Sequence, residues 1–310
     1  MNNSTILWVS FNLFVFVMLA LDLGVFHRKS HEVTVREALT WTAIWITLAM
    51  IFNLFVYYYF SKEKAIEFFT GYLIEKSLSV DNIFVIIMIF SYFNVPKAYQ
   101  HKVLFWGILG ALIMRVIFIF AGIELIHKFH WLIFVFGGFL VFTGIRMLTS
   151  SGAMIDPEKN PIVKFVRRIF PVTESFHGDR FFIRLQGALW ATPLFVVVML
   201  IEGTDLIFAV DSIPAILAIS DDPFIVYTSN VFAILGLRSL YFALAGIENY
   251  FRFLKYGLAA ILVFVGLKMC IVDFVKIPVE LSLMVIVFIL GLSMLASVMI
   301  TKSQKEQIES

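Results

Sequence analysis

The chain has 310 residues, of which 61% are hydrophobic and only 15% charged, and its formal net charge is +2. A typical soluble domain is about 45–50% apolar and about 25% charged, so this composition excludes an ordinary soluble protein. The long apolar runs are continuous rather than alternating, which excludes a membrane β-barrel. The chain is therefore expected to be an all-α polytopic membrane protein.

Apolar runs of about 20 residues, the length that crosses a bilayer as a helix, occur nine times along the chain. The nine predicted spans are residues 5–26, 39–60, 65–91, 103–126, 131–149, 187–219, 225–246, 256–273 and 279–300. The sixth is too long, since a straight helix of that length would extend about 50 Å against a hydrocarbon core of about 30 Å. We expect this span either to break, at Gly203 or Pro214, or to extend past the bilayer, with Pro193 marking the membrane interface.

Basic residues are distributed unevenly between the two sets of loops. The loops at 27–38, 92–102, 150–186 and 247–255, together with the carboxyl-terminal tail, hold 15 Lys and Arg residues, and the opposite loops hold four. Cytoplasmic loops carry the excess of Lys and Arg, so the amino terminus is predicted outside and the carboxyl terminus in the cytoplasm. We expect a bacterial inner-membrane protein surrounded by lipid bilayer. No nucleic-acid partner is expected, and the sequence identifies no protein partner.

Three landmarks occur twice in the same order, which indicates an internal repeat. The paired copies are residues 75–82 and 205–212, residues 120–124 and 244–248, and residues 142–146 and 264–268. Spans three to five and six to eight are therefore two copies of a three-helix unit. Three crossings carry the chain to the other side, so the two repeats are predicted to be inverted. Many secondary transporters have this architecture and bind their substrate near the midplane.

The predicted organisation follows from the two repeats. Two amino-terminal helices (1–64) precede the first repeat (65–149), and a cytoplasmic linker (150–186) joins it to the second repeat (187–273). A final helix with a cytoplasmic tail (274–310) ends the chain. The linker is the only long polar stretch, and we expect it to serve as a plain connection.

Each acidic segment places a carboxylate, a second carboxylate six residues later, and a small polar side chain after that. Ionised groups in a membrane cost about 2.5–3.5 kcal/mol each, so a duplicated pair predicts one site built from two halves. On a helix, Glu75 and Asn82 share a face with Ser79 between them, whereas Asp81 lies about 120° from Glu75. The second copy repeats this spacing. The candidate ligands are Glu75, Asp81, Asn82, Asp205, Asp211 and Ser212.

Further charged side chains lie within the predicted spans. Asp22, in the first span, has no copy in the repeat, and we expect it to reach the site. Glu202, one helical turn before Asp205, is a candidate gate or outer partner of the site. The candidate counter-ions are Arg115, Arg238 and Lys76. In the alternative interpretation, the acids serve only to pair with these buried cations.

An acid-rich site with only oxygen ligands suits a hard divalent cation: Mn²⁺, Mg²⁺ or Ca²⁺. The six histidines lie in loops or at span ends and the one cysteine, Cys270, lies outside the repeated motif, so zinc and copper are disfavoured. Surplus carboxyl groups could carry protons and so couple metal movement to proton movement. We expect no permanently bound cofactor. We expect no enzyme either, because the sequence offers neither a nucleophile–base pair nor an HExxH motif.

The stretches 75–82 and 202–214 resemble those of the TerC family of integral membrane proteins, named for tellurium resistance, and so does Asp22 followed by Leu-Gly-Val-Phe. The resemblance extends over nearly the whole chain. It implies manganese efflux with the intramembrane acids as the ion path, in an exporter built from three-helix repeats. Some family members are linked instead to metal loading of secreted enzymes or to membrane-protein insertion. The alternative function is therefore a non-transporting membrane factor.

Overall fold

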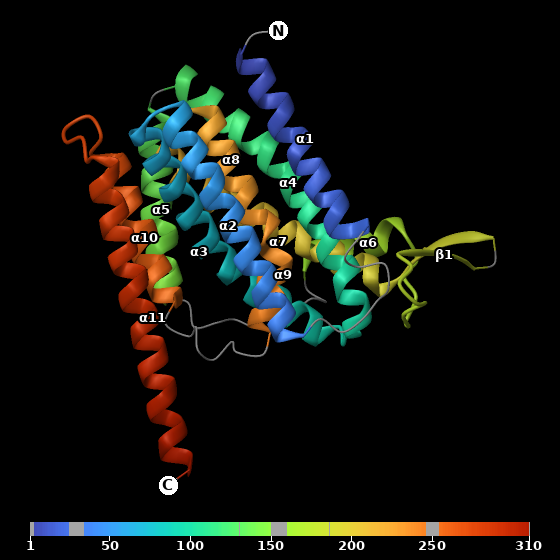
Figure 1. Cartoon of the computed structure of the whole chain (residues 1–310). Coiled ribbons are helices and arrows are strands. Elements are labelled where there is room, and N and C mark those ends of the chain that lie inside the picture. Colours follow the sequence, from blue (N-terminus) through green and yellow to red (C-terminus); the bar gives the residue numbers. More distant parts are fainter. Residues whose placement is uncertain are drawn as a thin grey trace.

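A computed structural model describes residues 3–24, 34–129, 131–149, 160–185, 187–245 and 254–309, and these form a helical bundle with one small hairpin (Figure 1). The helices are α1 (Asn3–Gly24), α2 (Val35–Tyr59), α3 (Lys62–Tyr92), α4 (Lys97–Lys128), α5 (Leu132–Thr149), α6 (Pro161–Ile169), α7 (Pro193–Leu217), α8 (Pro223–Leu235), α9 (Leu237–Leu244), α10 (Leu254–Cys270) and α11 (Val279–Glu309). The antiparallel strands are β1 (Phe182–Leu185) and β2 (Ala188–Ala191). The all-α prediction is confirmed for the bundle.

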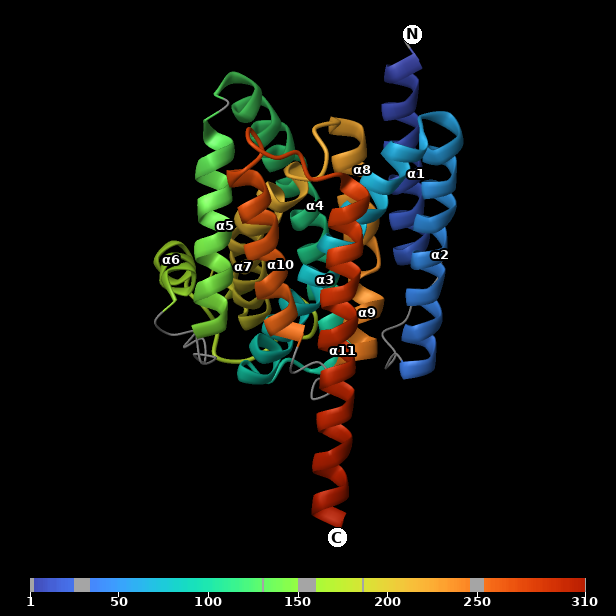
Figure 2. The same cartoon turned by 90° about the vertical axis from the view of Figure 1, so that its left-hand side faces the viewer.

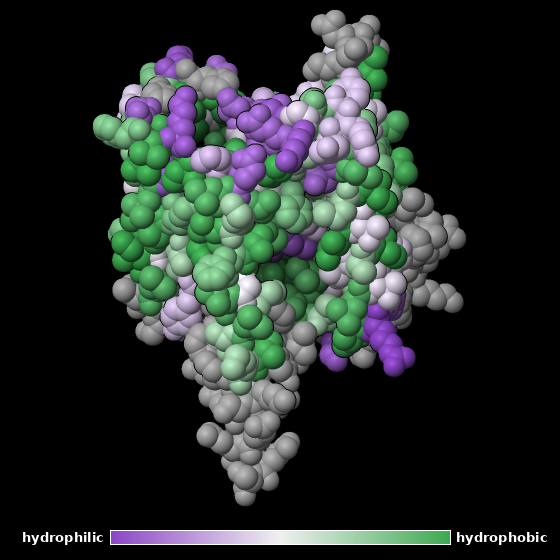
Figure 3. Space-filling view, turned by 60° about the vertical axis from the view of Figure 1, so that its left-hand side comes forward, coloured by the Kyte–Doolittle hydropathy of each residue, from purple (hydrophilic) through white to green (hydrophobic). Residues whose placement is uncertain are grey.

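Each predicted span overlaps one helix or a pair of helices, and the sixth also includes β2. Among the described residues, five segments are long and apolar enough to cross a membrane by themselves: α2, α4, α7, α8 with α9, and α11. α1 and α5 contain shorter apolar stretches. The two ends of the chain lie at opposite ends of the bundle (Figures 1 and 2). Apolar side chains cover the middle of the face in Figure 3, and hydrophilic ones gather toward its upper end, which is the distribution expected around a bilayer core.

The sixth predicted span begins too early. Its first residues form β2, and α7 starts only at Pro193, which occupies the first helical turn after an extended Thr192 (φ −94°, ψ 164°). A proline is favoured there because its missing N–H would have no partner inside the helix. The resulting helix has 25 residues, about 37 Å at the usual rise, and it runs without a break through Gly203.

Gly203 has a packing role instead. A side chain at this position would overlap Ile162 of α6, so the bare backbone lets α6 lie close to α7. The predicted linker thus contains α6 and β1, and its last described residues lead into β2. Gly187, between the strands, has φ +82°, a conformation that favours glycine.

The seventh predicted span is two helices, α8 and α9, separated at Gly236. A Cβ at Gly236 would lie 2.8 Å from Nζ of Lys76 and 3.1 Å from Cβ of Trp45. The Lys76 ammonium donates a hydrogen bond to the carbonyl of Ala233 at 3.1 Å. Carbonyls in the last turn of a helix lack intrahelical partners, so Lys76 satisfies one that the break exposes.

The closest helix packing joins α5 to α10, through glycines. A Cβ at Gly266 of α10 would lie 2.6 Å from the carbonyl oxygen of Gly137, and one at Gly144 of α5 would lie 2.7 Å from that of Ala259. Small residues let membrane helices approach in this way. Elsewhere α3 packs on α8, and α4 on α7, so the middle of the bundle is shared by these four helices.

Candidate functional site

Arg115 of α4 forms a buried ion pair with Glu75 of α3. Its Nη1 donates to Oε2 of Glu75 at 2.7 Å, and its Nη2 lies 2.6 Å from Oε1. The two residues are only 5% and 1% exposed. A guanidinium that meets a carboxylate through both nitrogens makes strong, directional hydrogen bonds. This pair offsets much of the cost of placing either charge inside the bundle.

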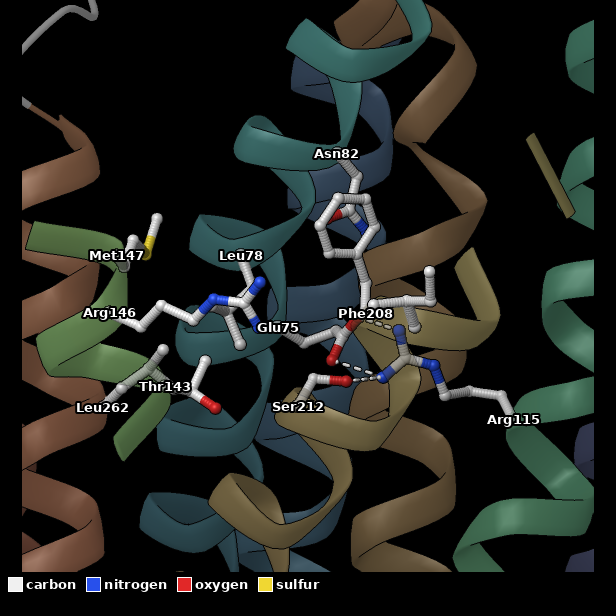
Figure 4. Close-up of a pocket in the computed structure, with 11 residues that line it drawn as sticks. Glu75, Leu78, Asn82, Arg115, Thr143, Arg146, Met147, Phe208, Ser212 and Leu262 are labelled. Atoms are coloured by element: carbon white, nitrogen blue, oxygen red, sulfur yellow. Dashed lines mark hydrogen bonds and ion pairs between the residues drawn. The ribbon is translucent and has the colours of Figure 1, made fainter. Parts of the chain in front are cut away.

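The same guanidinium also contacts two polar residues of the other half of the chain. Nη1 of Arg115 donates to Oγ of Ser212 in α7 and to Oδ1 of Asn230 in α8, the latter at 3.2 Å. The side-chain amide of Asn230 in turn donates to the carbonyl of Val226 at 2.7 Å. Figure 4 shows Arg115, Glu75 and Ser212 converging from three helices. With Asn230, four helices meet at one cation.

A small cavity lies beside this ion pair. It is lined by Glu75, Ser79 and Asn82 of α3 and by Asp205 of α7, among others, and has a volume of about 10 Å³. That is about the room that one water molecule requires. The three α3 residues lie together as their spacing predicts, and Asp205 comes from the second acidic segment. The cavity therefore joins a carboxylate from each of the two predicted repeats.

Asp205 differs from Glu75 in its surroundings. It is 9% exposed, and it forms no ion pair with any side chain that the structure describes. A buried carboxylate needs a compensating charge or ligand. Of the acids whose side chains the structure describes, Asp205 is therefore the best placed to bind a cation or a proton from outside the protein.

A larger cavity of about 310 Å³ shares Glu75, Asn82 and Arg115 with the small one. Its other walls come from α5, α7 and α10. They include Thr143, Arg146, Met147, Phe208, Ser212 and Leu262. In Figure 4, Arg146 and Arg115 extend toward Glu75 from opposite sides. Since Arg146 is three residues before the end of α5, this cavity extends from Glu75 toward that end of the bundle.

The remaining predicted residues take different positions. Lys76 turns toward the break between α8 and α9 and binds a backbone carbonyl there. The Glu202 carboxylate lies against Gly110 of α4, where any added Cβ would overlap it. Arg238 is buried in α9. None of these three lines either of the two cavities.

Three predicted ligands, Asp22, Asp81 and Asp211, have side chains outside the described part of the structure. Their backbones lie in α1, α3 and α7. Among the side chains that are described, no three His, Cys, Asp or Glu residues come together as a metal site. The small cavity thus has two carboxylates, those of Glu75 and Asp205. A complete cation site would need further oxygen ligands, from Asn82, Ser79 or the three acids whose side chains are not described.

Asn230 and Glu67 are among the residues whose polar contacts within the bundle were not predicted from the sequence. Asn230 is fully buried in α8 and accepts a hydrogen bond from Arg115. Glu67 of α3 pairs with Lys64 at 2.8 Å and accepts a hydrogen bond from Ser220. In the sequence, each is a polar residue within or at the edge of an apolar run, and neither belongs to the duplicated acidic segments.

Comparison with known proteins gives several matches. The model of the integral membrane protein TerC family matches residues 60–305. A membrane protein of Myxococcus xanthus designated STKORF319 is 55% identical over 291 residues, which cover 94% of this chain and 91% of that protein. Proteins named Alx, described as proposed membrane-bound redox modulators, are 46% identical over 311 residues in Escherichia coli K12 (97% of both chains) and 45% identical over 314 residues in Salmonella typhi (98% of both chains). No solved structure matches the chain.

Proposed function

Because the chain belongs to the TerC family of integral membrane proteins, we propose that it is an inner-membrane transporter that exports Mn²⁺, a hard divalent cation, by alternating access in exchange for protons. The observation that carries the proposal is the small cavity lined by Glu75 and Asp205, one carboxylate from each acidic segment, inside a membrane bundle. Intramembrane acids that meet in this way are typical of ion paths.

The contact pattern of the glycines supports the inverted repeat. Gly144 meets Ala259 and Val263 across the α5–α10 interface, and Gly266 meets Gly137 and Val141. Three pairs of positions are each separated by 122 residues: 144 and 266, 137 and 259, and 141 and 263. One set of contacts therefore maps onto the other. In the predicted repeat, α3 corresponds to α7, and α4 corresponds to α8 with α9. The packing of α3 on α8 is therefore the counterpart of the packing of α4 on α7, which agrees with the same two-fold relation.

Arg115 fits a role in the exchange. In this structure its guanidinium neutralises Glu75. The side chain of Arg115 thus occupies the position at which a transported cation would bind. A divalent cation that engages Glu75 and Asp205 would release the guanidinium toward Ser212 and Asn230, which already accept hydrogen bonds from it. When the ion leaves, the ion pair forms again, or a proton takes its place on a carboxyl group.

The larger cavity supports loading from the cytoplasm. It extends from Glu75 to Arg146 and Met147, close to the end of α5 that leads into the basic 150–186 segment. The distribution of Lys and Arg assigns that side to the cytoplasm. An exporter would accept its ion there, so this conformation corresponds to an inward-open state.

The name of the Alx relatives suggests an effect on cellular redox state. A disulfide within this chain cannot provide one, because Cys270 is its single cysteine. A change in the concentration of a metal ion offers another route to such an effect, and it requires no thiol chemistry in the transporter.

The test is metal flux through the purified protein in proteoliposomes, with Mn²⁺, Ca²⁺ and Mg²⁺ supplied separately. We expect Mn²⁺ to cross with an opposing proton movement, and Asp205→Asn to slow it by on the order of 10-fold or more, because a charged ligand is lost. Glu280→Gln, at an exposed acid in the first turn of α11, is the control and should leave flux unchanged. If cells carrying Asp81→Asn and cells carrying Asp211→Asn both retain no more Mn²⁺ than the parent, the site assignment is wrong.

A second candidate is the non-transporting factor for metal loading or assembly of secreted proteins. The observation that favours it is the β1–β2 hairpin, which projects from the side of the bundle (Figure 1) and offers a surface to another protein. This function predicts that no metal crosses the proteoliposome membrane, and that shortening the hairpin abolishes the activity in cells. Flux that persists after the hairpin is shortened favours the transporter.

A further inference from the structure

The helix α6 presents a surface that the proposed transport site does not use. Its outward side carries three exposed basic side chains, Lys164, Arg167 and Arg168, and two exposed apolar ones, Phe165 (59%) and Ile169 (52%). We call these five residues the α6 surface. Among the side chains that the structure describes, none of the three cations forms an ion pair.

The opposite side of α6 fixes it to the bundle. Val163 and Val166 are buried, and Ile162 lies against Gly203 of α7. Asn160 caps the amino end of the helix by accepting a hydrogen bond from the backbone N–H of Ile162 at 2.9 Å. These contacts hold the short helix in one orientation, and as a result the α6 surface faces outward.

α6 lies across the long helices rather than along them. It is beside α7 on the flank of the bundle in Figure 1 and is seen nearly end-on in Figure 2. With 100° per residue, Phe165 and Ile169 lie next to the buried valines, and the three basic residues occupy the other half of the helix. This is the pattern of an amphipathic helix that lies in the plane of a membrane interface.

The basic and the apolar side chains of the α6 surface together restrict the depth at which α6 can lie in the bilayer. Guanidinium and ammonium groups avoid the hydrocarbon core, whereas exposed Phe and Ile side chains gain free energy by leaving water. Both requirements are met if the boundary between headgroups and acyl chains runs along α6. Of the acids that follow the helix, Glu174 is exposed and Asp179 pairs with Lys102, so no ion pair between α6 and either of them is described.

We propose that the α6 surface binds the headgroups of anionic phospholipids, with Phe165 and Ile169 inserted among the acyl chains. The contact would hold α7, which carries Asp205, at a fixed depth in the bilayer. The inference depends on the charge and exposure of α6 alone. It therefore stands or falls separately from metal transport.

The experiment uses the full chain with Cys270→Ser, so that Phe165→Cys provides the only thiol, labelled with a fluorophore. The protein is reconstituted in mixtures of phosphatidylcholine and phosphatidylglycerol, in which one lipid at a time carries brominated acyl chains that quench nearby fluorophores. The ratio of the two quenching curves gives the relative binding of the anionic lipid at α6. We expect a clear preference for phosphatidylglycerol, lowered by the triple change Lys164→Gln, Arg167→Gln and Arg168→Gln by up to roughly fivefold for each charge removed.

The matched control removes three exposed lysines at the other end of the bundle, through Lys62→Gln, Lys128→Gln and Lys276→Gln. It alters net charge equally and should leave the lipid preference at position 165 unchanged. The proposal is overturned if the control lowers the preference as much as the α6 triple change. It is also overturned if the label shows no preference for phosphatidylglycerol, or if neither lipid quenches it, since the α6 surface would then face water or another protein.

Discussion

At the scale of single residues, the two described acids of the site behave differently. Glu75 has a dedicated partner in Arg115, as the alternative interpretation of buried ion pairing requires. Asp205 lines the same small cavity without a described ion pair. A direct ion pair is therefore described for one of the two acids, and binding of an added cation by the other is our proposal.

Replacing Arg115 tests how much this ion pair contributes to stability. Arg115→Ala leaves Glu75 buried without its cation, so we expect a loss of about 3–5 kcal/mol in the free energy of unfolding, measured by denaturation in detergent. Arg115→Lys should recover part of this, because an ammonium cannot make the bidentate contact. Arg167→Ala, at an exposed position on α6, should change stability by no more than about 0.5 kcal/mol. Equal stability of Arg115→Ala and the parent would mean that the pair is not charged.

At the scale of helices, glycines decide where the bundle packs and where it breaks. Gly137, Gly144 and Gly266 bring the backbones of α5 and α10 together, and Gly203 admits α6 beside α7. Gly236 separates α8 from α9 next to Lys76. Each position is crowded by a neighbouring backbone or side chain, so the missing Cβ has a specific consequence.

The α5–α10 interface gives a prediction with an internal control. Gly266→Ala would place a methyl group 2.6 Å from the carbonyl oxygen of Gly137, and a backbone atom cannot rotate away. We expect a loss of about 1–3 kcal/mol, seen as a lower unfolding temperature in detergent. Gly138→Ala, one residue from Gly137 but facing open space, should be neutral or slightly stabilising because alanine favours helix. If both variants unfold like the parent, the close packing of α5 on α10 is incorrect.

At the scale of the whole molecule, the two ends of the bundle differ from each other. The first and last helices, α1 and α11, extend toward opposite ends of the bundle (Figures 1 and 2), which agrees with the odd number of crossings predicted from the sequence. Together with the membership of the TerC family, this arrangement is that of an integral membrane protein, and transport between two compartments is our proposal for its function.

Labelling of single cysteines tests this topology. In a Cys270→Ser background, we expect a membrane-impermeant maleimide to label Asn3→Cys in intact cells, and Lys305→Cys only after the membrane is permeabilised. Ser151→Cys, in the basic segment after α5, should behave like Lys305→Cys. Labelling of both termini from the same side would contradict the predicted odd number of spans.

The sequence by itself determined the class of the protein and the approximate place of its helices. Continuous apolar runs permit little else in a bilayer, because backbone groups without water must bond within their own helix. The spacing of Glu75, Ser79 and Asn82 also predicted correctly that they lie together, since the helical period fixes which residues share a face. The uneven distribution of Lys and Arg gave the proposed orientation in the same direct way.

Only the tertiary structure decided which side chains meet across helices. The pairing of Arg115 with Glu75, the contacts with Ser212 and Asn230, and the turn of Lys76 toward Ala233 join residues that are 40 to 157 positions apart. The close approach of Trp45 to Gly236 and of Ile162 to Gly203 is likewise a tertiary contact that local sequence does not reveal. Helix periodicity sets the face of each residue, but packing between helices determines what that face meets.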